Sequence, residues 1–234
     1  MLSAHRLPSL PGLCALCHGW GEQRVCADCL ARWAPAKPRC ARCAIDIPAA
    51  TALCGACLHA PPPYESAVAA FDYAPPWDGL IARFKFNAGL DLLASLTRAL
   101  LMAIRTSSVS LPALVLPVPL SKRRLMERGY NQAWEIARRL GAELRCRSDP
   151  HLLLRIADTP HQLALPPSAR AANVRGAFAV EPLRIAELRG KPVAVVDDVM
   201  TTGATAAEVT RCLLQAGAAS VHLWVLARTP RPDR

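Results

Sequence analysis

Short apolar runs alternate with longer segments of helical spacing from residue 64 onward. Runs rich in Val, Leu and Ala predict three buried strands and one outer strand, at 113–118, 192–197, 221–227 and 67–73 respectively. Apolar residues at helical spacing predict helices over 90–104, 131–140 and 205–216, and Gly217 is a good terminator for the last of these. The segment 176–188 fits neither period. This alternation predicts an α/β fold with a parallel sheet and helices on both faces.

The first 60 residues follow a different pattern, because they hold eight of the ten cysteines and few apolar residues for a core. Three consecutive prolines at 61–63 then predict a stiff, extended linker. We therefore expect two parts, a small cysteine-rich module over 1–60 and an α/β domain over 64–230.

The eight cysteines form four C-x-x-C pairs, made by Cys14, Cys17, Cys26, Cys29, Cys40, Cys43, Cys54 and Cys57. Two such pairs supply the four thiolates of a closed tetrahedral zinc site, so four pairs predict two structural Zn²⁺ ions and a double zinc ribbon. Pairing in sequence order closes shorter loops than alternate pairing, which favours it. A redox dithiol and an iron–sulfur cluster are the alternatives.

Charge and hydropathy narrow the class of protein. The formal net charge is +10. Eight cysteine thiolates would add eight negative charges and two Zn²⁺ ions four positive ones, which leaves a net charge of +6. A basic protein of this kind suits an anionic partner. No apolar run approaches the roughly 18 residues of a membrane span, so we expect no membrane insertion. The N-terminus also lacks the apolar core of a secretion signal, so we expect a cytoplasmic protein with reduced thiols.

The most informative stretch is Val-Ala-Val-Val-Asp-Asp-Val-Met-Thr-Thr-Gly-Ala-Thr at 193–205. It places two acids at the end of a buried strand and then a hydroxyl-rich glycine turn that enters a helix. Carboxylates accept hydrogen bonds from vicinal hydroxyls, and a helix N-terminus with exposed N–H groups binds phosphate. The pattern therefore predicts a ribose 5-phosphate site formed by Asp197, Asp198, Val199, Met200, Thr201, Thr202, Gly203, Ala204 and Thr205.

A basic segment follows the first inner strand and suits a diphosphate, since arginine can chelate phosphate oxygens. Its candidate residues are Ser121, Lys122, Arg123, Arg124 and Arg128. The alternative is a solvated basic loop that precedes a helix. Lys85 is a further candidate cation, with an exposed lysine on a partly buried helix as the alternative.

The long connection 155–178 carries several polar side chains and little periodicity, which is typical of an active-site lid. The residues that support this interpretation are Thr159, Gln162, Leu165, Arg170, Asn173 and Phe178. An ordinary long connection would also explain them.

The stretch at 193–205 resembles the phosphoribosyl pyrophosphate (PRPP) signature of type I phosphoribosyltransferases. Together with the four C-x-x-C pairs, it makes nearly the whole chain similar to the ComF family. Further matches are Pro-Pro-Pro-Tyr at 61–64, Phe-Asp-Tyr at 71–73, Lys-Phe at 85–86 and Arg-Gly-Tyr-Asn-Gln at 128–132. The resemblance implies that Asp197 and Asp198 hold the ribose hydroxyls, that 201–205 bind the 5′-phosphate, and that the first core loop binds pyrophosphate.

The resemblance also implies a cytoplasmic protein linked to the import or use of single-stranded DNA. Three functions compete. The first is Mg²⁺-dependent transfer of the phosphoribosyl group to an unknown acceptor. The second is a non-catalytic competence accessory protein that binds PRPP or a nucleotide and contacts DNA-import proteins or single-stranded DNA. The third is a zinc-ribbon nucleic-acid binder, and an intact phosphate loop argues against that as the whole function.

Overall fold

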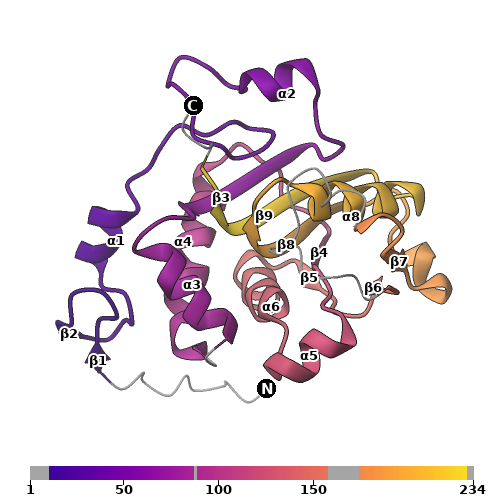
Figure 1. Ribbon diagram of the computed structural model, residues 1–234. Coiled ribbons are helices and arrows are strands. Elements are labelled where there is room, and N and C mark those ends of the chain that lie inside the picture. Colours follow the sequence, from indigo (N-terminus) through magenta and orange to yellow (C-terminus); the bar gives the residue numbers. More distant parts are fainter. Residues whose placement is uncertain (1–10, 87–88, 158–173, 231–234) are drawn as a thin grey trace.

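A computed structural model describes residues 11–86, 89–157 and 174–230 (Figure 1). Its centre is a five-stranded sheet in the order β3-β9-β8-β4-β5, with every neighbouring pair parallel. The strands are β3 (Ser66–Asp72), β4 (Leu114–Pro117), β5 (Arg147–Ser148), β8 (Pro192–Met200) and β9 (Ser220–Arg228). The predicted parallel sheet is confirmed.

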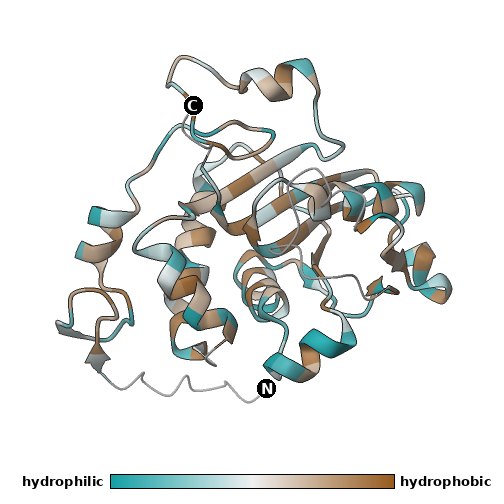
Figure 2. Ribbon diagram, viewed as in Figure 1, coloured by the Kyte–Doolittle hydropathy of each residue, from teal (hydrophilic) through white to brown (hydrophobic). Residues whose placement is uncertain are grey.

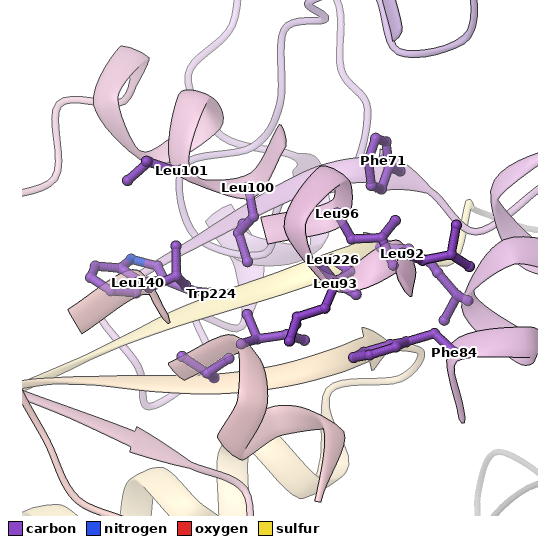
Figure 3. Packing of buried hydrophobic residues seen from close by; sticks show 14 of the residues in the cluster. Phe71, Phe84, Leu92, Leu93, Leu96, Leu100, Leu101, Leu140, Trp224 and Leu226 are labelled. Carbon is purple, nitrogen blue, oxygen red and sulfur yellow. The ribbon is translucent and has the colours of Figure 1, made fainter. Parts of the chain in front are cut away.

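Helices cover both faces of this sheet, as predicted. α4 (Leu93–Thr106) and α6 (Gln132–Leu144) pack on one face, and α8 (Ala204–Gln215) packs on the other. Because side chains alternate along a strand, Ala194 and Val196 of β8 join the first core while Val193 and Val195 join the second. Figure 3 shows the first core, where Trp224 and Leu226 of β9 lie among leucines of α4 and α6.

Several elements were not predicted, and apart from α3 they are too short to show a period. These are the helices α3 (Trp77–Phe86) and α5 (Lys122–Arg128), the 3₁₀ turn η3 (Pro182–Glu187), and the antiparallel strands β6 (Leu153–Arg155) and β7 (Phe178–Val180). Boundaries of predicted elements also differ. The helix predicted over 90–104 begins as the 3₁₀ turn η1 (Leu90–Leu92) and continues as α4 to Thr106. β8 continues to Met200, so the two acids lie within the strand, and α6 continues to Leu144.

The cysteine-rich module spreads along one side of the α/β domain (Figure 1). Its first half contains β1 (Gly12–Leu13), β2 (Trp20–Gly21) and α1 (Ala27–Trp33) and contacts α3 and α4. There Trp77 Nε1 donates to the Trp33 carbonyl at 2.7 Å. Its second half contains α2 (Gly55–His59), and Ala67 N of β3 donates to the Ala41 carbonyl at 3.0 Å.

The distribution of hydrophobic residues agrees with this arrangement of a buried sheet and outer helices. In Figure 2 the central strands are mostly brown and α5 is largely teal. Within the three described ranges, no helix combines the length and the apolar composition that crossing a membrane requires.

Candidate functional site

The two acids of β8 lie next to each other near the carboxyl end of the sheet. Asp197 Oδ1 accepts from Asp198 N at 2.8 Å, and Asp198 Oδ1 accepts from Val199 N at 2.6 Å. Burial, followed by the charge of Asp198, raises the pKa of Asp197 to about 7. The pair therefore carries a variable charge near neutral pH.

The turn after β8 leads directly into α8. Gly203 is the residue before the helix and has a φ of 81°, a left-handed conformation that glycine adopts without strain. Thr202 Oγ1 accepts from Ala204 N at 3.4 Å. The positive end of the α8 dipole thus lies beside a turn that carries hydroxyl groups, which is favourable for a phosphate.

The basic segment after β4 is the helix α5 and not the loop that we expected. Ser121 caps this helix by accepting from Arg124 N at 3.4 Å, so its buried side chain has a structural role. Helical geometry separates the basic side chains around the axis. Arg124 and Arg128, four residues apart, line the cavity described below, whereas Lys122 and Arg123 are exposed and outside that lining.

Lys85, at the end of α3, reaches the acid pair. Its Nζ lies 2.9 Å from Asp198 Oδ1, and both side chains are mostly buried, with exposed fractions of 17% and 13%. The structure therefore favours the interpretation of Lys85 as a site cation over that of an exposed surface lysine.

The run 128–132 holds the end of α3 in this position. The Tyr130 hydroxyl donates to the Phe84 carbonyl, and Gln132 Nε2 donates to the Lys85 carbonyl at 3.2 Å. The Arg128 guanidinium lies 4.8 Å from the centre of the Phe86 ring. Asn131 caps α6 by accepting from Ala133 N at 3.0 Å, and it donates to the Val118 carbonyl at 3.1 Å.

These groups surround one cavity of about 180 Å³ at the carboxyl ends of β4 and β8, where open α/β sheets bind ligands. On the side of β8 and α8 the lining consists of Asp197, Asp198, Val199, Met200, Thr201, Gly203, Ala204 and Thr205. The cations of the lining are Lys85, Arg124, Arg128 and Arg155. The fold thus brings the acids, the turn at 201–203 before α8 and four cations from distant parts of the chain to one place.

Arg155 was not singled out as a binding residue, because its strand β6 has only three residues and no clear pattern. Its guanidinium lies 5.4 Å from the centre of the Phe178 ring on the paired strand β7. Of the residues proposed for a lid, Thr159, Gln162, Leu165, Arg170 and Asn173 lie outside the described residues, whereas Phe178 is buried in β7.

The eight paired cysteines form two tetrads in sequence order, which confirms the favoured pairing. The first tetrad is Cys14, Cys17, Cys26 and Cys29, and the second is Cys40, Cys43, Cys54 and Cys57. Within each tetrad all sulfur atoms lie within 4.8 Å of one another.

Tetrahedral coordination with zinc–sulfur bonds near 2.3 Å separates the sulfur atoms by about 3.8 Å. The distance between Cys17 Sγ and Cys26 Sγ is 3.8 Å, and that between Cys43 Sγ and Cys54 Sγ is 3.6 Å. Both tetrads could therefore hold a structural metal ion such as zinc.

The comparisons with known proteins agree with this architecture. A family model described as "Phosphoribosyl transferase domain" matches residues 156–233. DNA utilization protein YhgH of Escherichia coli O6:H1 is 36% identical over 228 residues, which cover 94% of this chain and 99% of that protein.

Two competence proteins are also similar. Competence protein F of Haemophilus influenzae is 33% identical over 195 residues, which cover 82% of this chain and 85% of the relative. Competence protein ComFC of Bacillus subtilis is 29% identical over 150 residues, which cover 64% and 58% of the two chains. With relatives of this identity and coverage, the chain belongs to the ComF family of phosphoribosyltransferase-domain proteins.

Proposed function

We propose that the cavity binds PRPP together with Mg²⁺ and that the protein transfers the phosphoribosyl group to an acceptor. The observation that carries this proposal is the arrangement around one cavity. Two carboxylates and a phosphate-type turn come from β8 and α8, and Lys85, Arg124, Arg128 and Arg155 add four cations to the same lining. A ligand with sugar hydroxyls and phosphates at both ends matches this distribution of charge.

Each part of the ligand has a proposed partner. Asp197 and Asp198 accept hydrogen bonds from the ribose 2′- and 3′-hydroxyls. Residues 201–205 bind the 5′-phosphate through backbone N–H groups and hydroxyls at the start of α8. Arg124, Arg128 and Lys85 bind the diphosphate, for which guanidinium and ammonium groups are suitable counterions.

In the proposed reaction an acceptor nitrogen forms a bond to C1 of the ribose while the bond from C1 to the diphosphate oxygen breaks. Pyrophosphate leaves with the electron pair, and the acceptor releases its proton to solvent. Magnesium would supply charge neutralisation on the leaving diphosphate, and the carboxylates of the acid pair are oxygen donors of the kind it prefers. The protein's own contribution is to orient the ribose and to stabilise the charge of the leaving group.

Calorimetry with PRPP and Mg²⁺ tests the binding site. We expect Asp198→Ala and Thr202→Ala each to weaken binding by about 1.5–3 kcal/mol, which is typical of a lost hydrogen bond to a charged group. Asp28→Asn removes an exposed carboxylate of α1 and serves as the control. Unchanged affinity in both site variants would rule out this assignment.

Turnover needs a separate test, because binding and transfer would use the same residues. Purified protein is mixed with PRPP, Mg²⁺ and a panel of bases and amines, and pyrophosphate release is measured. Release that depends on one acceptor, and that is lost in Asp198→Ala, supports an enzyme. Tight PRPP binding without release under any condition supports the non-catalytic alternative.

That alternative is an accessory protein of competence or DNA utilization, the processes named in the relatives' descriptions. One observation favours a contact with single-stranded DNA. Trp20, on the hairpin of the first tetrad, is 79% exposed, and the Arg32 guanidinium lies 5.2 Å from the centre of the Trp33 ring. Exposed aromatic rings with nearby cations are typical stacking surfaces for unpaired bases.

Fluorescence anisotropy with a labelled oligonucleotide tests this alternative. We expect weak binding without sequence preference, which falls as salt rises and is reduced in Trp20→Ala. Saturating PRPP should weaken oligonucleotide binding only if the α5 region also contacts DNA. Absence of binding at low salt would leave protein contacts as the link to DNA uptake.

We also propose that residues 1–60 form a double zinc ribbon and residues 64–230 the phosphoribosyltransferase-like domain. The two closed tetrads support zinc, because four thiolates per site leave no open position for catalysis. A cytoplasmic location would keep all eight thiols reduced and available to the metal.

A further inference from the structure

We infer that the second cysteine tetrad positions the phosphate turn through Arg228, so that metal occupancy of that tetrad and PRPP affinity are coupled. This inference rests on the proposed function. It concerns a residue that has no role in the assignments above and that lies at the end of β9, beside the end of β8, where Met200 and Arg228 are partners in the sheet.

The Arg228 guanidinium joins two separate backbone segments. Its Nε donates to the Cys43 carbonyl at 3.0 Å, and Cys43 is a member of the second tetrad. Its Nη1 donates to the Met200 carbonyl at 3.0 Å and to the Thr201 carbonyl, both at the start of the phosphate turn. Because the guanidinium is planar with donors in fixed directions, it holds these segments in a defined relative position.

A second bridge connects the same two segments. Arg42, within the Cys40–Cys43 turn, donates from Nη1 to the Tyr64 carbonyl at 2.9 Å. The Tyr64 hydroxyl in turn donates to Met200 Sδ at 3.9 Å. The same hydroxyl lies 3.2 Å from the position that a side-chain carbon at Gly203 would occupy. Both bridges therefore start in one C-x-x-C turn and end between residues 200 and 203.

The shape of that C-x-x-C turn depends on the contacts of its cysteine sulfur atoms, which are the candidate metal ligands. Cys54 N donates to Cys40 Sγ at 3.3 Å, and Ala44 N donates to the Cys40 carbonyl at 2.8 Å, so the thiolates and the backbone form one compact unit. Since Cys43 contributes both a ligand sulfur and the carbonyl that Arg228 binds, loss of the metal would release both. The first tetrad packs elsewhere, against α4, where Val25 N donates to Ser95 Oγ at 3.2 Å.

Coupling between two binding sites is reciprocal, so the ligand must also strengthen the metal site. We expect saturating PRPP with Mg²⁺ to raise the zinc affinity of the second tetrad by about fivefold or more, the lower end of typical coupling. The zinc affinity of the first tetrad should change much less. Each molecule thus contains its own control.

The test is an equilibrium competition between the zinc-loaded protein and a chromogenic zinc chelator, with and without PRPP in excess Mg²⁺. Cys17→Ser, which impairs only the first tetrad, assigns each step of zinc loss to its site. Arg228→Met keeps most of the apolar stem but no donors, and Arg228→Lys keeps the charge. PRPP should protect the second tetrad most in the wild type, less in Arg228→Lys and least in Arg228→Met, which keeps only the bridge through Arg42 and Tyr64.

Calorimetry on the zinc-loaded wild type is done first, and it separates the two possible failures. Absence of PRPP binding would overturn the proposed function and this coupling with it. PRPP binding that leaves both tetrads unchanged, or protects both equally, would overturn the coupling alone. The wild-type comparison decides this even if Arg228→Met fails to fold.

Discussion

At the scale of single residues, the site depends on three neighbouring charges. Asp197 and Asp198 are adjacent in β8, and the Lys85 ammonium lies against the second of them. Burial of Asp197, and then the charge of Asp198, raise the pKa of Asp197 more than Lys85 and Arg128 lower it, so this carboxyl group keeps its proton to an unusually high pH. A ligand with hydroxyl groups must compete with Lys85 for Asp198.

The first prediction at this scale concerns pH. Because the pKa of Asp197 is about 7, its carboxylate is mostly protonated at pH 6 and mostly ionised at pH 8. If PRPP binds the ionised form, the affinity should rise by up to about tenfold over this range, the ratio of the ionised fractions. Calorimetry at several pH values measures this, and Asp197→Asn reports the contribution of the ligand's own phosphates. Identical pH profiles in both proteins would contradict the prediction.

The same shift has a consequence for stability. The folded state binds the Asp197 proton more tightly than the unfolded state, whose carboxyl group has an ordinary pKa near 4. The free energy of unfolding should therefore lose this contribution as the pH rises from about 4 to 7. In Asp197→Asn the free energy of unfolding should depend less on pH between about pH 4 and 7, as measured by urea denaturation.

A second prediction separates the roles of Lys85. Lys85→Met keeps an apolar stem of similar length and removes the charge. We expect PRPP affinity to fall by roughly tenfold or more, as for a lost hydrogen bond between charged groups. The affinity for ribose 5-phosphate should stay the same or rise, because it has no diphosphate and Asp198 loses its competitor. Equal weakening of both ligands would contradict a role at the diphosphate.

At the scale of elements, short segments position the site. Tyr130, in the turn between α5 and α6, and Gln132, the first residue of α6, hold the end of α3 by donating to the Phe84 and Lys85 carbonyls. α6 itself is fixed to the sheet by close packing against β5. At Gly141, a side-chain carbon would lie 2.8 Å from the Cys146 carbonyl oxygen and would also overlap Ser148 Oγ.

This contact yields a stability prediction. Alanine has a higher helix propensity than glycine, yet Gly141→Ala should lower the free energy of unfolding by about 1–3 kcal/mol, because the backbone around Cys146 must move. The control is Gly79→Ala in α3, where no atom lies within 4 Å of the added carbon. In Gly79→Ala the free energy of unfolding should rise by about 0.5–1 kcal/mol. Urea denaturation of both proteins checks the opposite signs.

At the scale of the whole molecule, the cysteine-rich module is built into the domain at two places. The first tetrad packs against α3 and α4, and the second approaches the end of β8 and β9. Its short segments bury few apolar side chains of their own, so bound metal would provide much of their folding free energy.

We therefore predict two zinc ions per chain in protein purified without added metal, measured by elemental analysis. Removal of the metal should lower the thermal midpoint of the α/β domain as well, because Trp33 and Ala41 of the module are hydrogen-bonded to Trp77 of α3 and Ala67 of β3. Cys212→Ala, outside both tetrads, serves as the control for cysteine loss. Iron absorbance with little zinc would contradict the prediction.

The sequence by itself determined the features that depend on local pattern. The strands at 113–118, 192–197 and 221–227 follow from apolar runs, and the tetrads follow from C-x-x-C spacing, since two thiols on one turn need only a short loop closure. The acid pair and the turn that follows it, at 197–205, are contiguous in the chain, so the sequence alone identifies most of the residues on one side of the cavity.

Only the tertiary structure decided which residues complete the cavity. Lys85, Arg128 and Arg155 reach the cavity from three different elements, and helical geometry in α5 directs Arg124 inward while Lys122 and Arg123 face solvent. Arg228 ends an apolar strand and carries no signal in the sequence, because its importance comes from backbone carbonyls contributed by Cys43 and Met200. Contacts between residues far apart in the chain depend on how helices and strands pack, and the hydrophobic period within one segment does not contain that information.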